Sequence, residues 1–262
     1  MAPAVTSRIV DWLRRSRPLE GTLPTSVAIV LTATGKYLRF VPDFHASCRK
    51  FLLPETPKHL FVMTDRVDAD FFRASKDATA VYTEHRPWPF PTLLRFRYIT
   101  AIAPQLRAFS HLIAIDADTR VCSTIRERTF FGHPKPLFGV QHPGFVGKRG
   151  SFETDARSRA CVGPTDDASV YWAGGMWGGT IDAALQLAEE LAGRIDDDLS
   201  RGVIAVWHDE SHLNKFFSEN RARVHMHNPG YMYPESWRLF YRKRILALDK
   251  NHAAMREMES GG

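Results

Sequence analysis

Cysteines are few in this sequence, and long apolar runs are missing from it. The 3 cysteines show no paired spacing, so the sequence predicts neither a disulfide framework nor a cysteine-based zinc site. A reducing compartment is the simplest interpretation. There is no run of about 18 apolar residues, and the arginine-rich residues 1–20 lack the apolar core of a signal peptide. We therefore expect a cytoplasmic protein with no transmembrane segment; the alternative is a protein held peripherally at the inner face of the membrane by an amphipathic helix at residues 9–15.

Signatures of several common protein classes are also missing. The sequence has no Gly-x-Ser-x-Gly, the nucleophile motif of α/β-hydrolases, and no zinc finger or RNA-binding aromatic motif. Its glycine-rich run at residues 173–179 lacks the spacing of a dinucleotide-binding loop and the Lys-Ser/Thr of a P-loop. Basic residues are in small excess, 35 Lys+Arg against 29 Asp+Glu, for a net charge of +6. This excess fits either a mildly basic surface or an electropositive cleft for phosphate, and we expect no nucleic-acid partner.

The first half of the sequence alternates between short apolar stretches and helical patterns. The stretches that predict buried strands are residues 27–33, 59–64, 78–83 and 112–115. Between them, apolar residues recur at helical spacing from about Pro42 to Leu52 and over residues 92–102. Strands that alternate with helices are typical of a parallel sheet, so we predict an α/β fold.

The second half is less regular. It contains one clear helix, which we expect Thr180 to cap and which reaches at least Ile195. An apolar stretch at residues 204–207 predicts a further strand. The glycine-rich run predicts a close approach of the backbone either to a ligand or to another strand. The aromatic residues around it, Tyr171, Trp172 and Trp177, either stack on a sugar or belong to the core.

The acidic motif Asp116-Ala117-Asp118 directly follows the strand predicted at residues 112–115. In open α/β folds this edge of the sheet binds ligands, and alternation along a strand points both carboxylates the same way. Two hard oxygen ligands suit Mn²⁺ or Mg²⁺, ions that commonly also bind substrate phosphates. The alternative is a solvated turn that ends the strand.

A dense polar cluster at residues 208–212, with the sequence His-Asp-Glu-Ser-His, follows the strand predicted at residues 204–207. Two adjacent carboxylates beside histidines are costly unless they are used or exposed. The spacing differs from the His-Glu-x-x-His of metalloproteases, because Asp209 directly follows His208. The alternatives are a capped helix start with solvated charges and a metal pair of His208 and His212 on one helix face.

Five strings of this sequence match a known family in order and spacing. They are residues 112–118 (LIAIDAD), 136–145 (PLFGVQHPGF), 174–179 (GGMWGG), 205–215 (AVWHDESHLNK) and 250–252 (KNH). Through them, residues 27–256 resemble glycosyltransferase family 6, which includes the histo-blood-group A and B transferases, α1,3-galactosyltransferase, Forssman synthase and soluble bacterial relatives. The resemblance implies the A-type glycosyltransferase fold, an α/β fold in which a Rossmann-like nucleotide-binding half is fused to an acceptor-binding half. It also implies a retaining hexosyltransferase that moves N-acetylgalactosamine or galactose from UDP-GalNAc or UDP-Gal in α1,3 linkage to a β-galactoside glycan, fucosylated or not.

The resemblance further implies which residues bind the donor. The residues at matching donor positions are Thr32, Ala33, Thr34, Tyr37, Trp88, Arg95, Ala173, Gly174, Gly175, His208, Asp209, Lys250 and Arg256. Asp116 and Asp118 match the Mn²⁺-binding pair, with Mg²⁺ as the alternative ion. Gly175 stands where the blood-group A enzyme has glycine and the B enzyme has alanine. A missing methyl group leaves room for an acetamido group, which favours N-acetylgalactosamine.

On the acceptor side the resemblance implies a catalytic carboxylate and an acceptor site. Glu210 matches the catalytic position, either as a nucleophile or as a stabiliser of an oxocarbenium-like ion. The residues at matching acceptor positions are His142, Thr154, Trp207 and Glu235. Glu235 is a substitute, because Pro234 occupies the position of the acceptor-contacting Asp of the vertebrate enzymes.

From these matches we expect a catalytic domain at residues 26–256. It comprises a nucleotide-binding half at about 26–120, an acceptor and catalytic half at 121–245 and a basic tail at 246–256. Residues 1–25 form an extension, and we expect residues 257–262 to be disordered. The competing hypotheses are a non-catalytic UDP-sugar- or glycan-binding protein on the same fold and a zinc hydrolase using His208 and His212. The sequence leaves the oligomeric state open.

Overall fold

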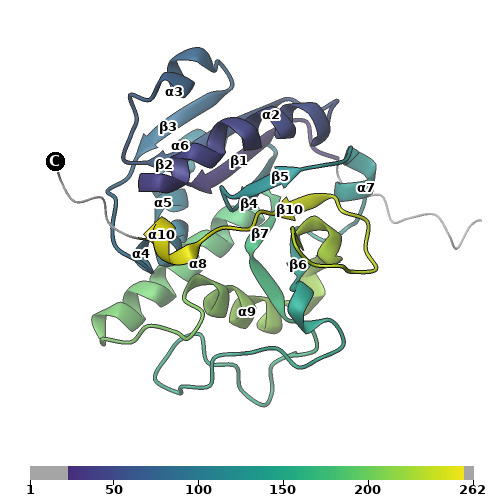
Figure 1. The fold of residues 1–262 in the computed structure, drawn as a ribbon. Helices are drawn as coiled ribbons and strands as arrows, with labels where there is room; N and C mark the ends of the chain where they lie inside the picture. The colour runs from purple at the N-terminus through teal and green to yellow at the C-terminus, as the bar shows by residue number, and fades with distance from the viewer. Residues whose placement is uncertain (1–22, 257–262) are drawn as a thin grey trace, which may run out of the picture.

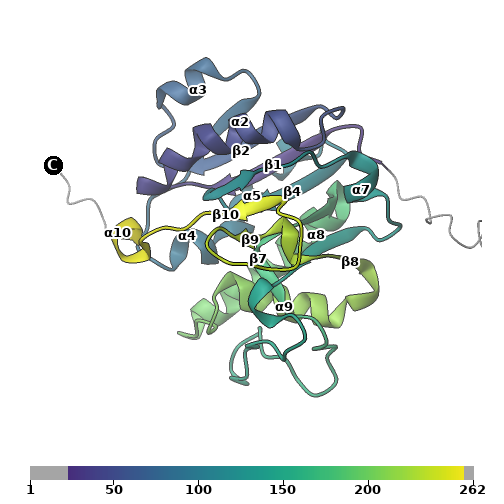
Figure 2. The same cartoon turned by 45° about the vertical axis from the view of Figure 1, so that its right-hand side comes forward.

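The computed structural model describes residues 23–256 (Figures 1 and 2). Residues 1–22, most of the predicted extension, and residues 257–262, predicted to be disordered, lie outside the described part. The strands are β1 (Val27–Thr32), β2 (Lys58–Thr64), β3 (Ala78–Tyr82), β4 (His111–Ile115), β5 (Thr119–Val121), β6 (Leu137–Gln141), β7 (Trp172–Thr180), β8 (Val224–His227), β9 (Tyr233–Pro234) and β10 (Ile245–Ala247). The α-helices are α2 (Val41–Phe51), α3 (Asp70–Ala74), α4 (Phe90–Leu93), α5 (Arg95–Ala101), α6 (Ala103–Leu106), α7 (Glu127–Phe131), α8 (Ile181–Ser200), α9 (Asp209–Glu219) and α10 (His252–Arg256), and the 3-10 helices are η1 (Gly35–Phe40), η2 (Pro143–Phe145), η3 (Arg221–Arg223) and η4 (Pro229–Tyr231).

The main sheet has seven strands in the order β3-β2-β1-β4-β7-β6-β8. β1 pairs in parallel with β2 and β4, and β2 pairs in parallel with β3. These four strands are the parallel sheet that the first half of the sequence predicts. β7 runs antiparallel to both β4 and β6, whereas β8 is parallel to β6. The predicted α/β fold is therefore confirmed, with a mixed second half.

The core lies in two layers, one on each face of the main sheet. Along β1, Ala28 and Val30 belong to the cluster that also contains residues of α5 and α8. The alternate residues Ile29 and Leu31 belong to the second cluster, which contains residues of α2. Helices accordingly lie on both sides of the strands (Figure 1). Because β1 is buried on both faces, its sequence is a continuous apolar run rather than an alternating one.

The strand order reverses between β1 and β4. β2 and β3 extend the sheet on one side of β1, and the later strands extend it beyond β4. In open α/β sheets such a reversal leaves a crevice at the carboxyl ends of the two strands. Thr32 ends β1 and Asp116 directly follows β4, so both residues lie at this crevice.

A small second sheet returns the C-terminal segment to the same crevice. Its strand order is β5-β10-β9, with β10 antiparallel to β5. Beyond β10, the backbone N–H of Leu248 donates to the carbonyl of Asp118 at 2.9 Å. The segment then continues to α10, drawn in yellow in Figure 1. The basic tail is thereby fixed beside the acidic motif, although about 130 residues separate them along the chain.

The prediction of one continuous helix over residues 92–102 is wrong. The structure has the short helices α4, α5 and α6 in its place, and Leu94 between the first two has a ψ of only 6°. Pro91 and Pro104 stand in the first turns of α4 and α6. Proline has no backbone N–H to donate to a preceding turn, so each one begins a new helix rather than extending the old one. The break makes Arg95 the first residue of α5.

The strand predicted at residues 204–207 is also wrong, because residues 204–205 have no regular structure and residues 206–207 belong to a turn before α9. The backbone donors of this turn bind side chains instead of a neighbouring strand. The N–H of Val206 donates to Glu153 Oε2 at 2.6 Å, and that of Trp207 donates to Ser211 Oγ at 3.0 Å. The apolar side chains of Val206 and Trp207 are exposed, 49% and 47% respectively. An apolar composition alone therefore misidentified a solvent-facing turn.

The predicted long helix of the second half is confirmed as α8, which begins directly after Thr180. Thr180 stands at the N-cap position with extended backbone, but its hydroxyl makes no capping hydrogen bond. Its backbone N–H instead donates to the carbonyl of Pro136. Neither α8 nor any other helix within residues 23–256 is long and apolar enough to cross a membrane.

Candidate active site

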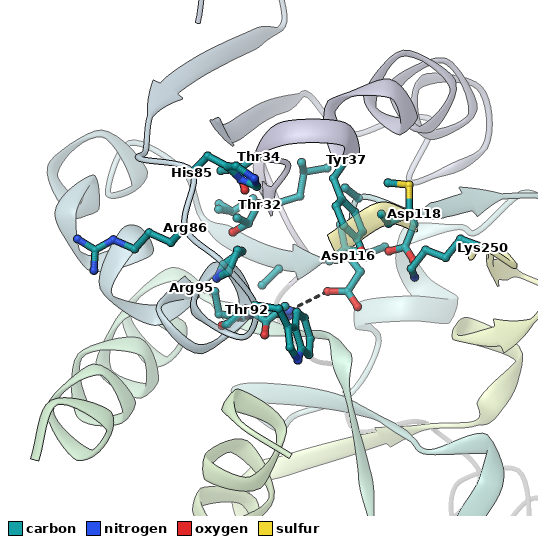
Figure 3. A pocket seen from close by; sticks show the side chains of 18 of the residues that line it. Thr32, Thr34, Tyr37, His85, Arg86, Thr92, Arg95, Asp116, Asp118 and Lys250 are labelled. Carbon is teal, nitrogen blue, oxygen red and sulfur yellow. Dashed lines mark hydrogen bonds and ion pairs between the residues drawn. The ribbon is translucent and has the colours of Figure 1, made fainter. Parts of the chain in front are cut away.

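A cavity opens at the carboxyl ends of β1 and β4 (Figure 3). The predicted donor and metal residues that line it are Thr32, Thr34, Tyr37, Trp88, Arg95, Asp116, Asp118 and Lys250. Ala33 does not line the cavity, because its side chain is fully buried in the core beside α2. His85 and Thr92 also line the cavity, and neither is predictable from the sequence because neither belongs to a recognisable motif.

Arg95 joins three parts of this site. Its Nη2 donates to Asp116 Oδ1 at 2.9 Å, and its Nη1 donates to the carbonyl of Gly174 at 3.0 Å. Its Nε lies 3.0 Å from Asp209 Oδ2. Only 11% of the arginine side chain is exposed, so solvent screens these contacts little. Arg95 therefore fixes the carboxylate after β4 relative to β7 and the start of α9.

Asp118, the second residue of the acidic pair, forms an ion pair with Lys250 of the C-terminal segment. Both side chains are about nine-tenths buried, with 12% of Lys250 and 10% of Asp118 exposed. The Lys250 ammonium also lies 5.7 Å from the ring centroid of Tyr37. The tail thus places a cation on the acidic motif. Arg256 ends α10, but its side chain lies outside the described part of the structure.

Glu210 lies in the first turn of α9 and points at β7. Its Oε1 accepts a hydrogen bond from the Tyr171 hydroxyl at 2.9 Å, and its Oε2 accepts one from the Gly174 N–H at 2.8 Å. Burial raises the pKa of Glu210 to about 7, against the opposing effect of these two hydrogen bonds. The sequence left Tyr171 open between stacking on a sugar and a place in the core. The structure shows it to be the partner of the candidate catalytic carboxylate.

The glycine-rich run forms β7, and two of its glycines approach the acidic groups. A Cβ atom on Gly174 would lie 2.9 Å from Glu210 Cβ. A Cβ atom on Gly175 would lie 2.7 Å from Asp116 Oδ2 and 2.5 Å from Met232 Cε. The neighbouring residues Trp172 and Trp177 are fully buried, which settles them as core residues. The run therefore approaches neighbouring strands, β4 and β6, and the acidic side chains of the site, while its approach to a ligand stays a prediction.

His208 and Asp209 precede Glu210 in a strained connection. His208 has a φ of 53° and a ψ of −123°, a conformation that costs non-glycine residues about 1–3 kcal/mol. Its ring lies 5.2 Å from that of Trp88, a residue of the cavity. Asp209 is buried, and this burial raises its pKa to about 6 although Arg95 opposes the shift. Strain and buried charge of this kind are concentrated at functional sites.

The predicted acceptor residues His142 and Trp207 lie on the β7 and α9 side of the site. His142 Nδ1 accepts from the Gly144 N–H at 3.1 Å, and its ring lies 5.7 Å from that of Tyr171. Burial lowers the pKa of His142 to about 4, so its imidazole is neutral at pH 7. Trp207 is 47% exposed, and its Nε1 donates to Ser151 Oγ at 2.9 Å. Tyr171 therefore links His142 to Glu210.

The other two predicted acceptor residues have different surroundings. Thr154 is exposed, and its backbone N–H donates to Glu153. Glu235 Oε2 accepts from the N–H of Asp249 at 3.1 Å, while its Oε1 lies 3.5 Å from Arg120 Nη2. The Glu235 carboxylate thus contacts the segment that carries Lys250. Its acceptor role stays a prediction.

Glu153 is a buried carboxylate that the sequence did not single out. It is 7% exposed, and Oε1 accepts from the backbone N–H groups of Thr154 and Asp155, both at 2.7 Å. Its Oε2 accepts from the N–H of Val206 at 2.6 Å. Glu153 therefore holds the turn that leads into α9 and Glu210. A single acidic residue in a loop has no sequence signal that would reveal these long-range contacts.

Replacing Glu153 by glutamine is expected to lower the free energy of unfolding by about 1–3 kcal/mol, because one amide oxygen cannot replace two carboxylate oxygens and a backbone N–H is left unsatisfied. Urea denaturation followed by circular dichroism measures the change. The exposed Glu189→Gln is the matched control and should be neutral. Equal stability of the two variants would show that Glu153 does not hold this turn.

The alternative of a metal pair formed by His208 and His212 is not supported. α9 begins at Asp209, so His208 precedes the helix and the two histidines do not share a helix face. His212 is only 1% exposed, and its Nε2 lies 3.5 Å from Asp198 Oδ2. Within residues 23–256, the one group of histidine, cysteine or acidic side chains spaced for a metal contains neither of them. The zinc-hydrolase hypothesis loses its basis.

Comparisons with known proteins agree with this geometry. The pattern of glycosyltransferase family 6 matches residues 20–257. The chain is 28% identical over 226 residues to the O-antigen biosynthesis glycosyltransferase WbnI of Escherichia coli, a match that covers 86% of this chain and 94% of that protein. It is 27% identical over 263 residues to the rat histo-blood group ABO system transferase 1, covering 94% and 72%. It is 23% identical over 248 residues to the human globoside alpha-1,3-N-acetylgalactosaminyltransferase 1, covering 89% and 69%.

The match spans nearly the whole chain and includes both halves of the site, from the strand β1 to the tail that carries Lys250. The mixed sheet flanked by helices is the arrangement expected of the A-type glycosyltransferase fold. The chain therefore belongs to glycosyltransferase family 6 and is a hexosyltransferase with the A-type fold.

Proposed function

We propose that the protein transfers N-acetylgalactosamine, with galactose as the alternative, from a UDP-sugar to a β-galactoside, forming an α1,3 linkage with retention of configuration. The observation that carries the proposal is an adjacency in β7. The Gly174 N–H donates to Glu210 Oε2 at 2.8 Å, and the carbonyl of Gly175 accepts from the Asp116 N–H at 2.9 Å. A candidate catalytic carboxylate and a candidate metal ligand are thus held by neighbouring residues of one strand.

The donor nucleotide belongs in the cavity at β1 and β4. Thr32, Thr34 and Tyr37 would hold the uridine, by hydroxyl hydrogen bonds and ring contact. The acidic pair would hold Mn²⁺, or Mg²⁺ as the alternative. The side chains fit a cation there, because each carboxylate already contacts a protein cation, Arg95 on Asp116 and Lys250 on Asp118. When bound, the ion would supply Lewis-acid stabilisation to the departing diphosphate.

Lys250 has two partners available in this scheme. In the structure its ammonium contacts Asp118. The diphosphate of a bound donor is negatively charged, as Asp118 is, so it would offer the Lys250 ammonium a second partner. A metal ion bound at Asp118 would displace the ammonium from that carboxylate. Lys250 would then stabilise the negative charge that develops on UDP.

Glu210 would act at the anomeric carbon. The bond from that carbon to the diphosphate breaks with its electron pair on UDP, and the acceptor oxygen bonds on the same face while its hydroxyl proton passes to the departing diphosphate. Glu210 either bonds the carbon transiently on the opposite face or stabilises an oxocarbenium-like ion. Both roles require the ionised carboxylate. The Tyr171 and Gly174 hydrogen bonds fix its two oxygens for either role.

The acceptor would approach over His142 and Trp207. The exposed Trp207 offers an apolar face to a galactose ring, and neutral His142 offers a hydrogen bond through Nε2.

The test is UDP release from UDP-GalNAc and UDP-Gal, with lactose or 2′-fucosyllactose as acceptor, in Mn²⁺ and in EDTA, followed by NMR of the product linkage. The proposal expects metal-dependent release, a preference for UDP-GalNAc and an α1,3 product. Binding of UDP-sugar without release or transfer with any galactoside would favour the non-catalytic binding protein instead. A β-linked product would overturn retention.

Gly175→Ala is expected to reduce the preference for UDP-GalNAc over UDP-Gal by about 10-fold or more, the usual effect of one methyl group in a pocket. The added Cβ would also press on Asp116 Oδ2, so the Mn²⁺ concentration for half-maximal activity should rise. The ratio of kcat/KM values for the two donors measures the first effect. Gly193→Ala in α8 is the matched control, because nothing lies within 4 Å of its added Cβ. An unchanged donor ratio in Gly175→Ala would remove this residue from donor selection.

The pH dependence follows from the pKa of Glu210, which burial raises to about 7. Because the ionised form is the active one, kcat/KM for the UDP-sugar should rise with pH and level off above about 7. Initial rates at low donor concentration measure this rising part of the pH profile for the free enzyme. Tyr171→Phe removes one hydrogen bond that favours the ionised form of Glu210, so the rise in kcat/KM should move to higher pH. If the rise stays at the same pH in this variant, it reports the titration of a group other than Glu210.

A further inference from the structure

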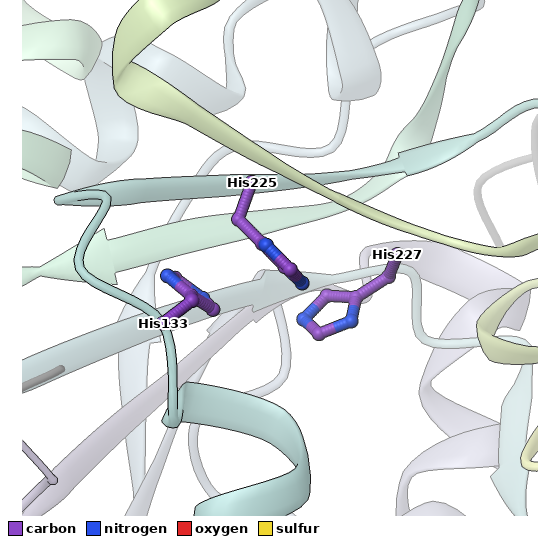
Figure 4. A group of neighbouring side chains, drawn as sticks. All are labelled: His133, His225 and His227. Carbon is purple, nitrogen blue, oxygen red and sulfur yellow. The ribbon is translucent and has the colours of Figure 1, made fainter. Parts of the chain in front are cut away.

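Three histidines gather at the far edge of the main sheet, outside the candidate active site (Figure 4). His225 and His227 lie on β8, the edge strand, and their spacing of two residues puts them on one face of it. His133 lies between α7 and β6, in the loop that leads to the strand paired with β8. One ring nitrogen from each histidine lies within 4.8 Å of the others. None of the three lines the donor cavity.

A deeply buried ring nitrogen of this group lacks a partner. Within the described residues, Nε2 of His227 makes no hydrogen bond. His227 is only 4% exposed. A buried nitrogen without a partner is costly, so its presence in a native fold requires an explanation such as a bound ion.

All three members of the group are imidazoles. Neutral imidazoles offer lone pairs to a borderline-soft ion such as Zn²⁺, and no carboxylate belongs to the group to attract a hard ion such as Mn²⁺.

We propose that His133, His225 and His227 form a binding site for Zn²⁺ or a similar late first-row divalent ion, distinct from the acidic pair of the active site. Its role is structural. An ion held by His133 and β8 would pin the loop before β6 to the edge of the sheet. With three protein ligands, the fourth position would belong to water.

Binding requires small movements of the rings. Tetrahedral Zn²⁺ with bonds of about 2.0–2.1 Å places its ligand nitrogens about 3.4 Å apart, whereas the three nitrogens in the structure lie within 4.8 Å of one another. The rings of His133 and His225 are stacked, with centroids 3.9 Å apart and planes at 11°. One of them must therefore turn, and His133, which lies on a loop, is free of strand pairing. Lys135 and Arg221, both hydrogen-bonded to the Val224 carbonyl, are nearby positive charges that weaken affinity.

The test is calorimetric titration of tag-free, EDTA-treated protein with Zn²⁺, beside the variants His133→Gln and His133→Gln/His225→Gln. Wild-type protein should bind one ion that raises Tm, and the double variant should bind it about 100-fold or more weakly. His59→Gln, which changes a histidine on β2, is the matched control and should bind as wild type. Co²⁺ substitution with X-ray absorption should show imidazole nitrogens around the ion.

A further variant tests whether the Zn²⁺ ion binds at the acidic pair instead. Asp116→Asn/Asp118→Asn should keep the Zn²⁺ site, so its loss there would assign the ion to the active site and overturn the proposal. Equal binding in wild type and the double histidine variant, or no binding in wild type, would overturn it as well. If the double variant does not fold, the single loop variant His133→Gln decides by the same comparison.

Discussion

Replacing Glu210 by glutamine is expected to lower kcat for sugar transfer by about 10³-fold while changing KM for the UDP-sugar only slightly. The glutamine has nearly the same shape, but it carries no negative charge toward the anomeric carbon. It also cannot accept both the Tyr171 and Gly174 hydrogen bonds, because one of its two polar atoms is a donor. The loss should therefore fall on the chemical step, with a smaller loss of about 1–3 kcal/mol in stability. Steady-state kinetics with UDP-GalNAc and lactose measure kcat and KM separately.

The control for this variant is Glu189→Gln, which removes the same charge from an exposed position of α8 and should leave kcat unchanged. A kcat for Glu210→Gln near that of wild type would remove Glu210 from the chemistry. The two roles of Glu210 separate in Glu210→Ala with added azide. A small anion entering the vacated space would release a β-glycosyl azide if the carboxylate is a nucleophile on that face.

The parts of the fold that the sequence predicted correctly depend on local patterns. The strands β1, β2 and β4 are short apolar runs because both of their faces are buried, and such runs are recognisable without any long-range information. The acidic motif was recognisable because Asp116 and Asp118 directly follow one of these runs. Its position at the reversal of strand order then follows from the topology of parallel α/β sheets.

The parts that the sequence did not predict depend on contacts between distant residues. The stretch 204–207 has the composition of a strand, but Val206 binds the Glu153 carboxylate from 53 residues away. His133, in the loop before β6, is likewise separated by about 90 residues from His225 and His227 of β8, and the pairing of β6 with β8 brings them together. Secondary-structure propensity contains no information on such partners, so these features appear only in the folded chain.

Changing Asp118 to asparagine is expected to lower Mn²⁺-dependent transfer by about 10³-fold, because an ion that stabilises the departing diphosphate supplies several kcal/mol to the transition state. Asparagine keeps an acceptor oxygen but loses the charge, so it holds a hard divalent ion poorly. The same change frees Lys250 from its ion pair, which should leave the tail more mobile without unfolding the core. Asp116→Asn should give a similar loss of activity, and its remaining oxygen can still accept from Arg95.

Activity with and without EDTA distinguishes loss of the ion from general damage. If the ion acts through this pair alone, EDTA should reduce wild-type activity to the level of Asp118→Asn and have no further effect on the variant, so the two perturbations are not additive. Additive losses would mean that Asp118 contributes through its contact with Lys250 rather than through a metal. Lys250→Met is the companion variant: it removes the ammonium, so it should weaken transfer but keep the response to EDTA. If Lys250→Met also loses its sensitivity to EDTA, Lys250 is needed to form the metal site itself.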